Sequence, residues 1–206
     1  MATKQKYEFS YVNSEEELEA ELRATNREIT EVVVHWTGTF LNQDIGAEEV
    51  HNWHTQRGFS GCGYHYIIRK DGRIQRGRPL ERAGAHALAN GHNNFSIGIS
   101  FVAGYNCMSG DPDRDQKVGS GSINENQFKS FDNFMRAFYK VYPGGQAFGH
   151  ADTDDKGKTD PGFDVEDYVF NKFGKQNTTL GNEKAKSRAE LVNTPPHWSP
   201  QVRVRT

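Results

Sequence analysis

Apolar runs and amphipathic stretches alternate along most of the chain, and each kind predicts a different element. The β-branched run Val32–Val34 predicts a buried inner strand, and residues 96–102 predict another of the same kind. Residues 63–69 and 73–77 predict two strands joined by a hairpin, because the Asp71-Gly72 pair between them supplies the positive φ of a tight turn. These segments together predict a β-sheet.

Apolar residues at helical spacing predict four helices between these strands. Ser14–Glu17 has the sequence of a capping box, in which a serine and a glutamate satisfy each other's free backbone donors, and it opens the first helix. The second is predicted over residues 47–57. Asn124 caps the third, which has aromatic residues on one face, and Asp164 begins the last, which runs through Phe173. Strands that alternate with helices predict an α/β fold, with helices flanking a central mixed β-sheet.

The length of the chain, 206 residues, suits one domain with a substantial core. Residues 1–30 form a helical lead-in in this interpretation, residues 31–174 form the main domain, and residues 175–206 form a polar tail. Prolines interrupt periodicity in the tail, where residues 182–192 could form a short helix. A polar loop rich in glycine and aspartate is predicted over residues 105–121.

Composition and charge argue against several classes of function. The formal net charge is -2, which argues against binding to nucleic acid or to an anionic membrane. No apolar run reaches the length of a membrane span. Residues 1–10 are polar, so we expect no Sec signal peptide. Cys62 and Cys107 are expected to be free thiols, as is usual in a protein made in the cytosol.

Two histidines and an aspartate stand out as candidate metal ligands. His35 ends the Val32–Val34 strand, and His150 and Asp160 fall on an irregular segment between two predicted helices. Two imidazoles and one carboxylate are a ligand set of catalytic zinc with its fourth position open to water. On spacing alone a structural histidine and a solvated acidic loop are the commoner interpretation. His51 and His54 could share a helix face, but without a third ligand nearby they are interpreted as surface or packing residues.

Five segments in a fixed order give the chain a resemblance to a known family. From residue 31 to residue 173 it resembles the zinc amidases that include T7-type phage lysozymes, recycling-type bacterial amidases and animal peptidoglycan recognition proteins. The resemblance identifies residues 31–174 as a zinc amidase catalytic domain. The segments are Val33–Thr37, Gly63–Gly72, Ala83–Ala87, Asn94–Ile99, and Gly149–His150 together with Lys158–Gly162.

The resemblance implies specific roles at matching positions. His35, His150 and Asp160 match the three zinc ligands, and the family accepts either cysteine or aspartate at the third. Lys158 matches the lysine that stabilises the oxyanion of the tetrahedral intermediate. Tyr64 matches the tyrosine that orients or deprotonates the attacking water in the T7-type and recognition-protein branches.

Other matching positions concern the substrate. His86 matches a histidine near the substrate cleft, and Trp36, Thr37 and Asn94 are candidates to line the groove; His86 could equally bond a loop carbonyl, and Trp36 could equally belong to the core. Ser100 stands where recycling-type amidases have a catalytic glutamate, so the resemblance implies the tyrosine version of the mechanism.

The implied activity is hydrolysis of the amide between the lactyl group of muramic acid and the first L-alanine of the peptidoglycan stem peptide. The favoured setting is a phage lysis enzyme that stays in the host cytoplasm without a signal peptide and reaches the cell wall after release. One alternative is a virion component that contacts tail or baseplate proteins through residues 105–121 or the tail. A non-catalytic peptidoglycan-binding module and a cytoplasmic recycling enzyme are the others.

Overall fold

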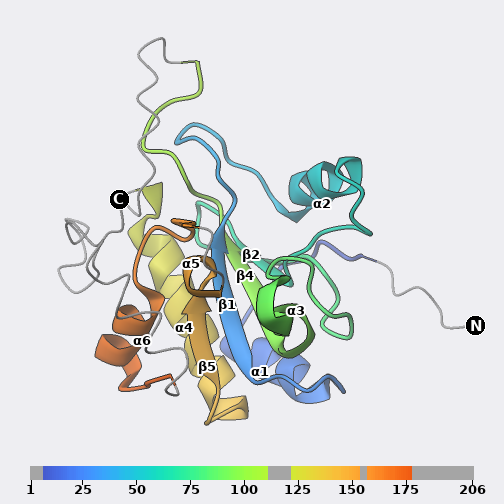
Figure 1. Ribbon diagram of the computed structural model, residues 1–206, viewed down its shortest axis with the longest axis vertical. Helices are drawn as coiled ribbons and strands as arrows, with labels where there is room; N and C mark the ends of the chain where they lie inside the picture. The colour runs from blue at the N-terminus through green and yellow to red at the C-terminus, as the bar shows by residue number, and fades with distance from the viewer. Residues whose placement is uncertain (1–6, 111–121, 154–156, 178–206) are drawn as a thin grey trace, which may run out of the picture.

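The computed structural model describes residues 7–110, 122–153 and 157–177 and contains a five-stranded sheet in the order β3-β2-β4-β1-β5. Strands β2, β4, β1 and β5 are parallel to their neighbours, whereas β3 pairs with β2 in the antiparallel sense. The predicted mixed sheet flanked by helices is confirmed (Figure 1). The strands are β1 (Glu31–Trp36), β2 (Tyr66–Ile68), β3 (Ile74–Arg76), β4 (Ser96–Phe101) and β5 (Gln146–Gly149).

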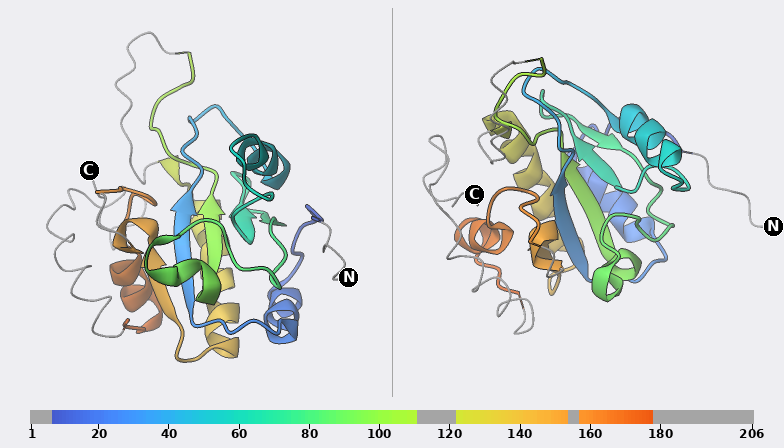
Figure 2. Two further views of the ribbon diagram at one scale, coloured as in Figure 1. Left: turned by 45° about the vertical axis from the view of Figure 1, so that its right-hand side comes forward. Right: turned by 45° about the horizontal axis from the view of Figure 1, so that its top comes forward.

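The helices divide between the two faces of the sheet. In Figure 1 and in the left view of Figure 2, α3 lies on the near side of β4 and α4 lies behind the sheet. None of the helices in the described part of the chain is long and apolar enough to span a bilayer. The helices are α1 (Glu15–Ala24), α2 (Ala47–Gln56), a 3₁₀ turn η1 (Ala89–Gly91), α3 (His92–Phe95), α4 (Glu125–Val141), α5 (His150–Thr153) and α6 (Val165–Phe173).

Alternation along β1 separates the core from the functional face. Val32, Val34 and Trp36 belong to the main hydrophobic cluster, which also holds residues of α1, α4 and α6. His35 lies between them in sequence, so its side chain points to the opposite face of the sheet. Its register partner on β4 is Ser100, whose side chain shares that face because paired residues of parallel strands point the same way.

Local helix signals are mostly confirmed. The Asn124 side chain accepts the backbone N–H of Gln127, whose own side chain accepts the N–H of Asn124, which completes the capping box of α4. The first capping box is only half formed. Ser14 accepts the N–H of Glu17, but the Glu17 carboxylate accepts the backbone N–H of Asn13 instead of that of Ser14.

The sequence predicts no strand before His150 and an irregular segment at His150 itself, and the structure differs at both places. Residues Gln146–Gly149 form a fifth strand parallel to β1, and His150 opens the short helix α5 directly after it. Four residues are too few to show a strand pattern, and their conformation depends on pairing with β1. The predicted strands at 63–69 and 73–77 are also shorter in the structure, which confines them to Tyr66–Ile68 and Ile74–Arg76.

Several sequence predictions concern segments at the margins of the described residues. Leu18 and Leu22 of α1 are buried in the main core, so the described part of the lead-in packs against the sheet domain. Cys62 and Cys107 are free thiols, as expected. The tail beyond residue 177, its predicted helix at 182–192, and the loop beyond residue 110 lie outside the described residues.

Candidate active site

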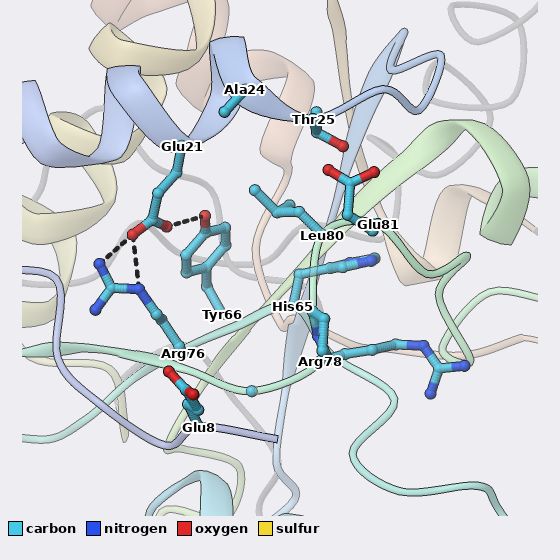
Figure 3. Close-up of a pocket in the computed structure, with 12 residues that line it drawn as sticks. Glu8, Glu21, Ala24, Thr25, His65, Tyr66, Arg76, Arg78, Leu80 and Glu81 are labelled. Atoms are coloured by element: carbon cyan, nitrogen blue, oxygen red, sulfur yellow. Dashed lines mark hydrogen bonds and ion pairs between the residues drawn. The ribbon is translucent and has the colours of Figure 1, made fainter. Parts of the chain in front are cut away.

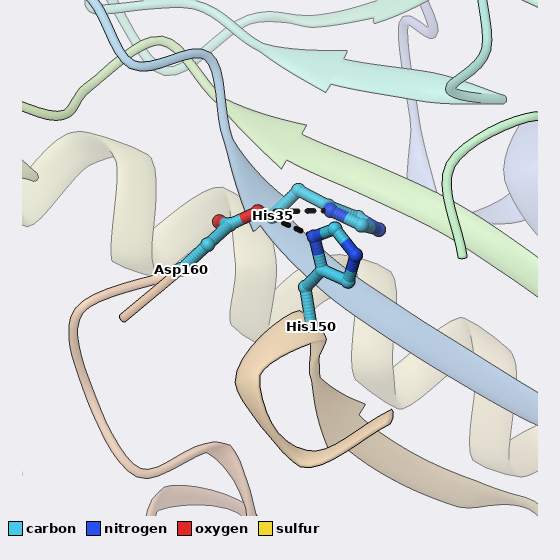
Figure 4. A group of neighbouring side chains, drawn as sticks. All are labelled: His35, His150 and Asp160. Carbon is cyan, nitrogen blue, oxygen red and sulfur yellow. Dashed lines mark hydrogen bonds and ion pairs between the residues drawn. The ribbon is translucent and has the colours of Figure 1, made fainter. Parts of the chain in front are cut away.

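Three potential ligands meet where β1 and β5 end. Because β1 and β5 are parallel and Val34 pairs with Gly149, His35 and His150 emerge side by side at one edge of the sheet. Asp160 reaches them from the loop before α6 (Figure 4). Its Oδ2 lies 3.1 Å from Nδ1 of His35 and 2.9 Å from Nδ1 of His150. Residues separated by more than a hundred positions thus form one polar group.

The backbone holds the Asp160 carboxylate in this orientation. The N–H of Trp36 donates to Oδ1 at 2.6 Å, which leaves Oδ2 directed at the two imidazoles. The Asp160 carbonyl accepts the N–H of Ala151 at 2.8 Å, which links the loop to the beginning of α5. Strand β1 and helix α5 therefore help to position a side chain that neither of them carries.

The electrostatics favour a neutral imidazole beside an ionised carboxylate. Burial lowers the pKa of His35 to about 4, although Asp160 opposes this shift. Burial alone would raise the pKa of Asp160, but the charges and hydrogen bonds of His35 and His150 outweigh it and lower that pKa. Near neutral pH, His35 thus keeps a ring lone pair and Asp160 keeps its negative charge.

These residues fit a divalent transition metal. One ligand atom from each of His35, His150 and Asp160 lies within 4.8 Å of the other two, and no other group of three such side chains occurs in the described ranges. Two imidazole nitrogens and a carboxylate oxygen leave a fourth tetrahedral position for water or substrate, as catalytic zinc requires. His51 and His54 instead accept the backbone N–H groups of Cys62 and Gly63, in agreement with a packing role.

The two predicted catalytic side chains flank this group. The Tyr64 ring lies just before β2, with its centroid 5.0 Å from that of His35. Burial, assisted by the charge of Asp160, raises the pKa of Tyr64, so its phenol is protonated and can donate a hydrogen bond. Nζ of Lys158 lies 2.6 Å from Nε2 of His150.

The structure brings only some of the predicted substrate residues to the metal-ligand group. Nδ1 of His86 lies 3.0 Å from Nε2 of His35, and Thr37 follows β1 directly, with its hydroxyl 2.9 Å from that of Thr39. The Trp36 side chain is buried in the core cluster, and only its backbone serves the site. Asn94 is exposed on α3, and its carbonyl accepts a hydrogen bond from Arg27.

Two residues that hold His86 in place escaped sequence reasoning. Ser96 Oγ lies 3.3 Å from Nε2 of His86, and the Asn93 side chain accepts the backbone N–H groups of His86 and Ala87. Ser100, at the position of the recycling-type glutamate, is buried near Tyr64. A polar side chain on a buried strand, as at Ser96, was the available signal.

A well-formed cavity lies away from this group of side chains. A hollow of about 350 Å³ between α1, β3 and the loop after β3 is lined by residues that include Glu21, His65, Tyr66, Arg76 and Arg78 (Figure 3). The Glu21 carboxylate binds both the Arg76 guanidinium and the Tyr66 hydroxyl there. None of the predicted ligands or catalytic residues lines this cavity.

Comparison with known proteins agrees with this geometry. The family model described as N-acetylmuramoyl-L-alanine amidase matches residues 25–163, a range that holds His35, His150 and Asp160. The endolysin of Enterobacteria phage K11 is 29% identical over 151 residues, which cover 73% of this chain and 92% of the K11 protein. The endolysin of Escherichia phage T7 is 37% identical over 86 residues, which cover 41% of this chain and 56% of the T7 protein.

A solved structure shares the architecture. The endolysin LysCS of Clostridium intestinale, an N-acetylmuramoyl-L-alanine amidase by its title, superposes with a TM-score of 0.53 at 25% identity. The superposition covers 76% of this chain and 84% of LysCS. The sheet order, the position of the polar group and the family match lead to one assignment. The chain belongs to the N-acetylmuramoyl-L-alanine amidase family.

Proposed function

We propose that the protein is a zinc-dependent hydrolase that cleaves the lactyl–L-alanine amide of bacterial peptidoglycan. The observation that carries the proposal is the approach of Nδ1 of His35, Nδ1 of His150 and Oδ2 of Asp160 to one another. Bound there, zinc would supply a Lewis acid that activates water and polarises the scissile carbonyl. Family membership supports the reaction, and the donor set supports the metal.

Tyr64, beside His35, and Lys158, beside His150, would act on the water and on the carbonyl oxygen respectively. A protonated Tyr64 would orient the attacking water by hydrogen bonding, since burial disfavours the phenolate that a general base requires. The charge of a bound dication would act against this effect on the pKa of Tyr64. Lys158, placed by its contact with His150, would stabilise the negative charge that develops on the carbonyl oxygen.

The substrate in this proposal is a muropeptide that lies along the face of the sheet bearing His35. Thr37, which directly follows β1, and His86, which contacts His35, are candidate contacts in this proposal. Asn94 would act from α3, and Trp36 would contribute through its backbone. The amine of L-alanine would leave after protonation, which completes the hydrolysis.

The biological setting is proposed from the relatives. Proteins named endolysin align with this chain, which supports a phage lysis enzyme that acts on the cell wall after release from the host cytoplasm. A virion component that contacts tail or baseplate proteins is the alternative setting. Immunodetection of the protein in purified phage particles would favour that alternative, and its absence there would favour a free lysis enzyme.

Two other activities compete with this proposal. A binding module would retain the fold without a competent ligand set, whereas all three ligand positions carry donor side chains here. A recycling enzyme would prefer soluble anhydro-muropeptides, and the serine at position 100 cannot act as the base that the glutamate supplies in that branch. Comparison of intact sacculi with soluble muropeptides as substrates separates a recycling enzyme from the proposed lysis enzyme.

Metal removal and restoration test the proposal. The purified full chain should contain about one zinc ion, lose cleavage of muropeptides after dialysis against a chelator, and regain it with added zinc. His150→Ala should bind muropeptide without cleaving it. Full cleavage by a zinc-free protein would refute the proposal, and binding without cleavage by the zinc-loaded wild type would favour the binding module.

A further inference from the structure

The His86 ring is held at both of its nitrogen atoms. Nδ1 lies 3.0 Å from Nε2 of His35, and Nε2 lies 3.3 Å from Oγ of Ser96. The rings of His35 and His86 meet edge to face, with centroids 4.9 Å apart and an interplanar angle of 81°. His86 therefore contacts the side of the His35 ring that faces away from Asp160.

Two glycines create the space that this ring occupies. A Cβ at Gly98 would lie 2.4 Å from Cδ2 of His86, and a Cβ at Gly84 would lie 2.4 Å from Nε2. No real side chain tolerates such contacts, so the ring fits only because both positions lack a Cβ. The two glycines come from different segments, β4 and the loop before η1, which enclose the ring between them.

The loop that carries His86 is itself fixed. Oδ1 of Asn93 accepts the backbone N–H of His86 at 2.8 Å and that of Ala87 at 2.9 Å. The carbonyl of Asn93 accepts the N–H of Gly84 at 2.8 Å. The fold thus encloses the His86 imidazole in a fitted site and directs it at a proposed metal ligand.

We infer that His86 is a positioning residue that fixes the ring orientation and the tautomer of His35 for metal binding, with Ser96 as its own partner. This inference rests on the proposed zinc site. A neutral imidazole whose Nδ1 is a ligand carries its proton on Nε2, and His86 Nδ1 is the acceptor in reach. His86 then carries its own proton on Nε2, where the Ser96 hydroxyl accepts it.

A positioning role for His86 predicts an effect on metal affinity, which a substrate contact does not. Partners of metal-ligating histidines set ligand orientation and basicity, and their loss typically weakens metal binding about 10–100-fold. A residue that only touched substrate would leave metal affinity unchanged. Metal affinity therefore separates the two roles without reference to catalysis.

The test compares two substitutions of similar size in the full-length protein. His86→Asn keeps an acceptor oxygen near the position of Nδ1, whereas His86→Leu fills the space of the ring without an acceptor. The zinc dissociation constant would be measured by competition with a chromophoric chelator. We expect His86→Leu to bind zinc about 10–100-fold more weakly than wild type and His86→Asn to stay within a few-fold of it. Nitrogen NMR of the zinc-loaded protein should show the His35 proton on Nε2, with faster solvent exchange in His86→Leu.

A matched control is His92→Leu. His92, on α3, pairs with Glu31 of β1 and contacts no proposed ligand in the described residues. This variant should keep wild-type zinc affinity. If His86→Leu does not fold, two other variants replace it in the same zinc-affinity measurement. Gly98→Ala displaces the His86 ring and Ser96→Ala removes its partner, and both should weaken zinc binding. Unchanged zinc affinity in His86→Leu would overturn the inference, and so would unchanged zinc affinity in both Gly98→Ala and Ser96→Ala. Equal losses of zinc affinity in His86→Leu and His86→Asn would overturn it as well. A wild-type protein that binds no zinc would instead defeat the proposed function itself.

Discussion

Oδ2 of Asp160 lies 3.1 Å from Nδ1 of His35, although 125 positions separate the two residues in the sequence. The contact is possible because the backbone N–H of Trp36, the next residue on β1, binds the other carboxylate oxygen. A carboxylate held at both oxygens and an imidazole kept neutral by burial form a pair that is ready to share a cation.

Removal of this carboxylate should abolish metal binding and activity together. Asp160→Ala deletes a ligand and leaves the Trp36 N–H and Nδ1 of His35 without their acceptor. We expect zinc affinity and cleavage to fall by at least about a hundredfold, and the metal-free protein to lose about 1–3 kcal/mol of unfolding free energy. Chelator competition, a muropeptide assay and urea unfolding would measure these effects. Asp44→Asn, at an exposed ion pair with Arg69, is the control that should behave as wild type.

Tyr64 offers a separation of chemistry from metal binding. Tyr64→Phe removes only the hydroxyl, and the ring can keep its place beside His35. We expect kcat to drop by about 10²–10⁴-fold while zinc content and KM change little. Wild-type turnover by a zinc-loaded Tyr64→Phe protein would show that the hydroxyl has no part in the reaction.

Lys158 should contribute through its fixed charge. Lys158→Met keeps much of the side-chain length but removes the ammonium near His150, so we expect kcat to fall by about 10²–10³-fold with zinc retained. Lys158→Arg restores a positive charge with different geometry and should recover part of the loss. A methionine variant as active as the arginine variant would rule out charge stabilisation by this residue.

His65 should make stability depend on pH. Burial, with the nearby charge of Arg27, lowers the pKa of His65 to about 3, whereas an unfolded histidine titrates near 6.5. Between these values the unfolded state binds a proton that the folded state does not, so unfolding free energy declines as pH falls through this window. One such group contributes a slope of up to about 1.4 kcal/mol per pH unit.

The variant His65→Asn isolates this contribution. Asparagine can still accept the Gly98 N–H that Nδ1 of His65 accepts, but it does not titrate. Urea unfolding at several pH values from 7 to 4 should show a shallower decline in the variant, whatever its stability at pH 7. Parallel declines in the two proteins would mean that His65 titrates normally in the fold.

Local and motif signals in the sequence predicted much of this molecule. The capping box of Asn124 and Gln127 depends on residues three positions apart, so sequence alone could predict it. The group of His35, His150 and Asp160 was accessible through family resemblance, because no local pattern relates positions so far apart. Its geometry comes from the parallel pairing of β1 with β5.

What escaped prediction depends on tertiary contacts. Strand β5 has four residues, and its conformation is set by the edge of β1 that it pairs with. The continuous apolar run in β1 gave no indication of which face each residue takes, so the sequence left Trp36 open between the groove and the core, and its side chain packs in the core. The space for the His86 ring depends on glycines from two segments, and no rule of sequence spacing predicts that these glycines meet.

Mass spectrometry of purified sacculi after digestion tests the central claim most directly. The zinc-loaded protein should release stem peptides with a free N-terminal L-alanine and leave the glycan strands intact, and the chelated protein and Asp160→Ala should release none. Cleaved glycan strands, cuts within the stem peptide, or the same L-alanine termini from the metal-free protein would contradict the account.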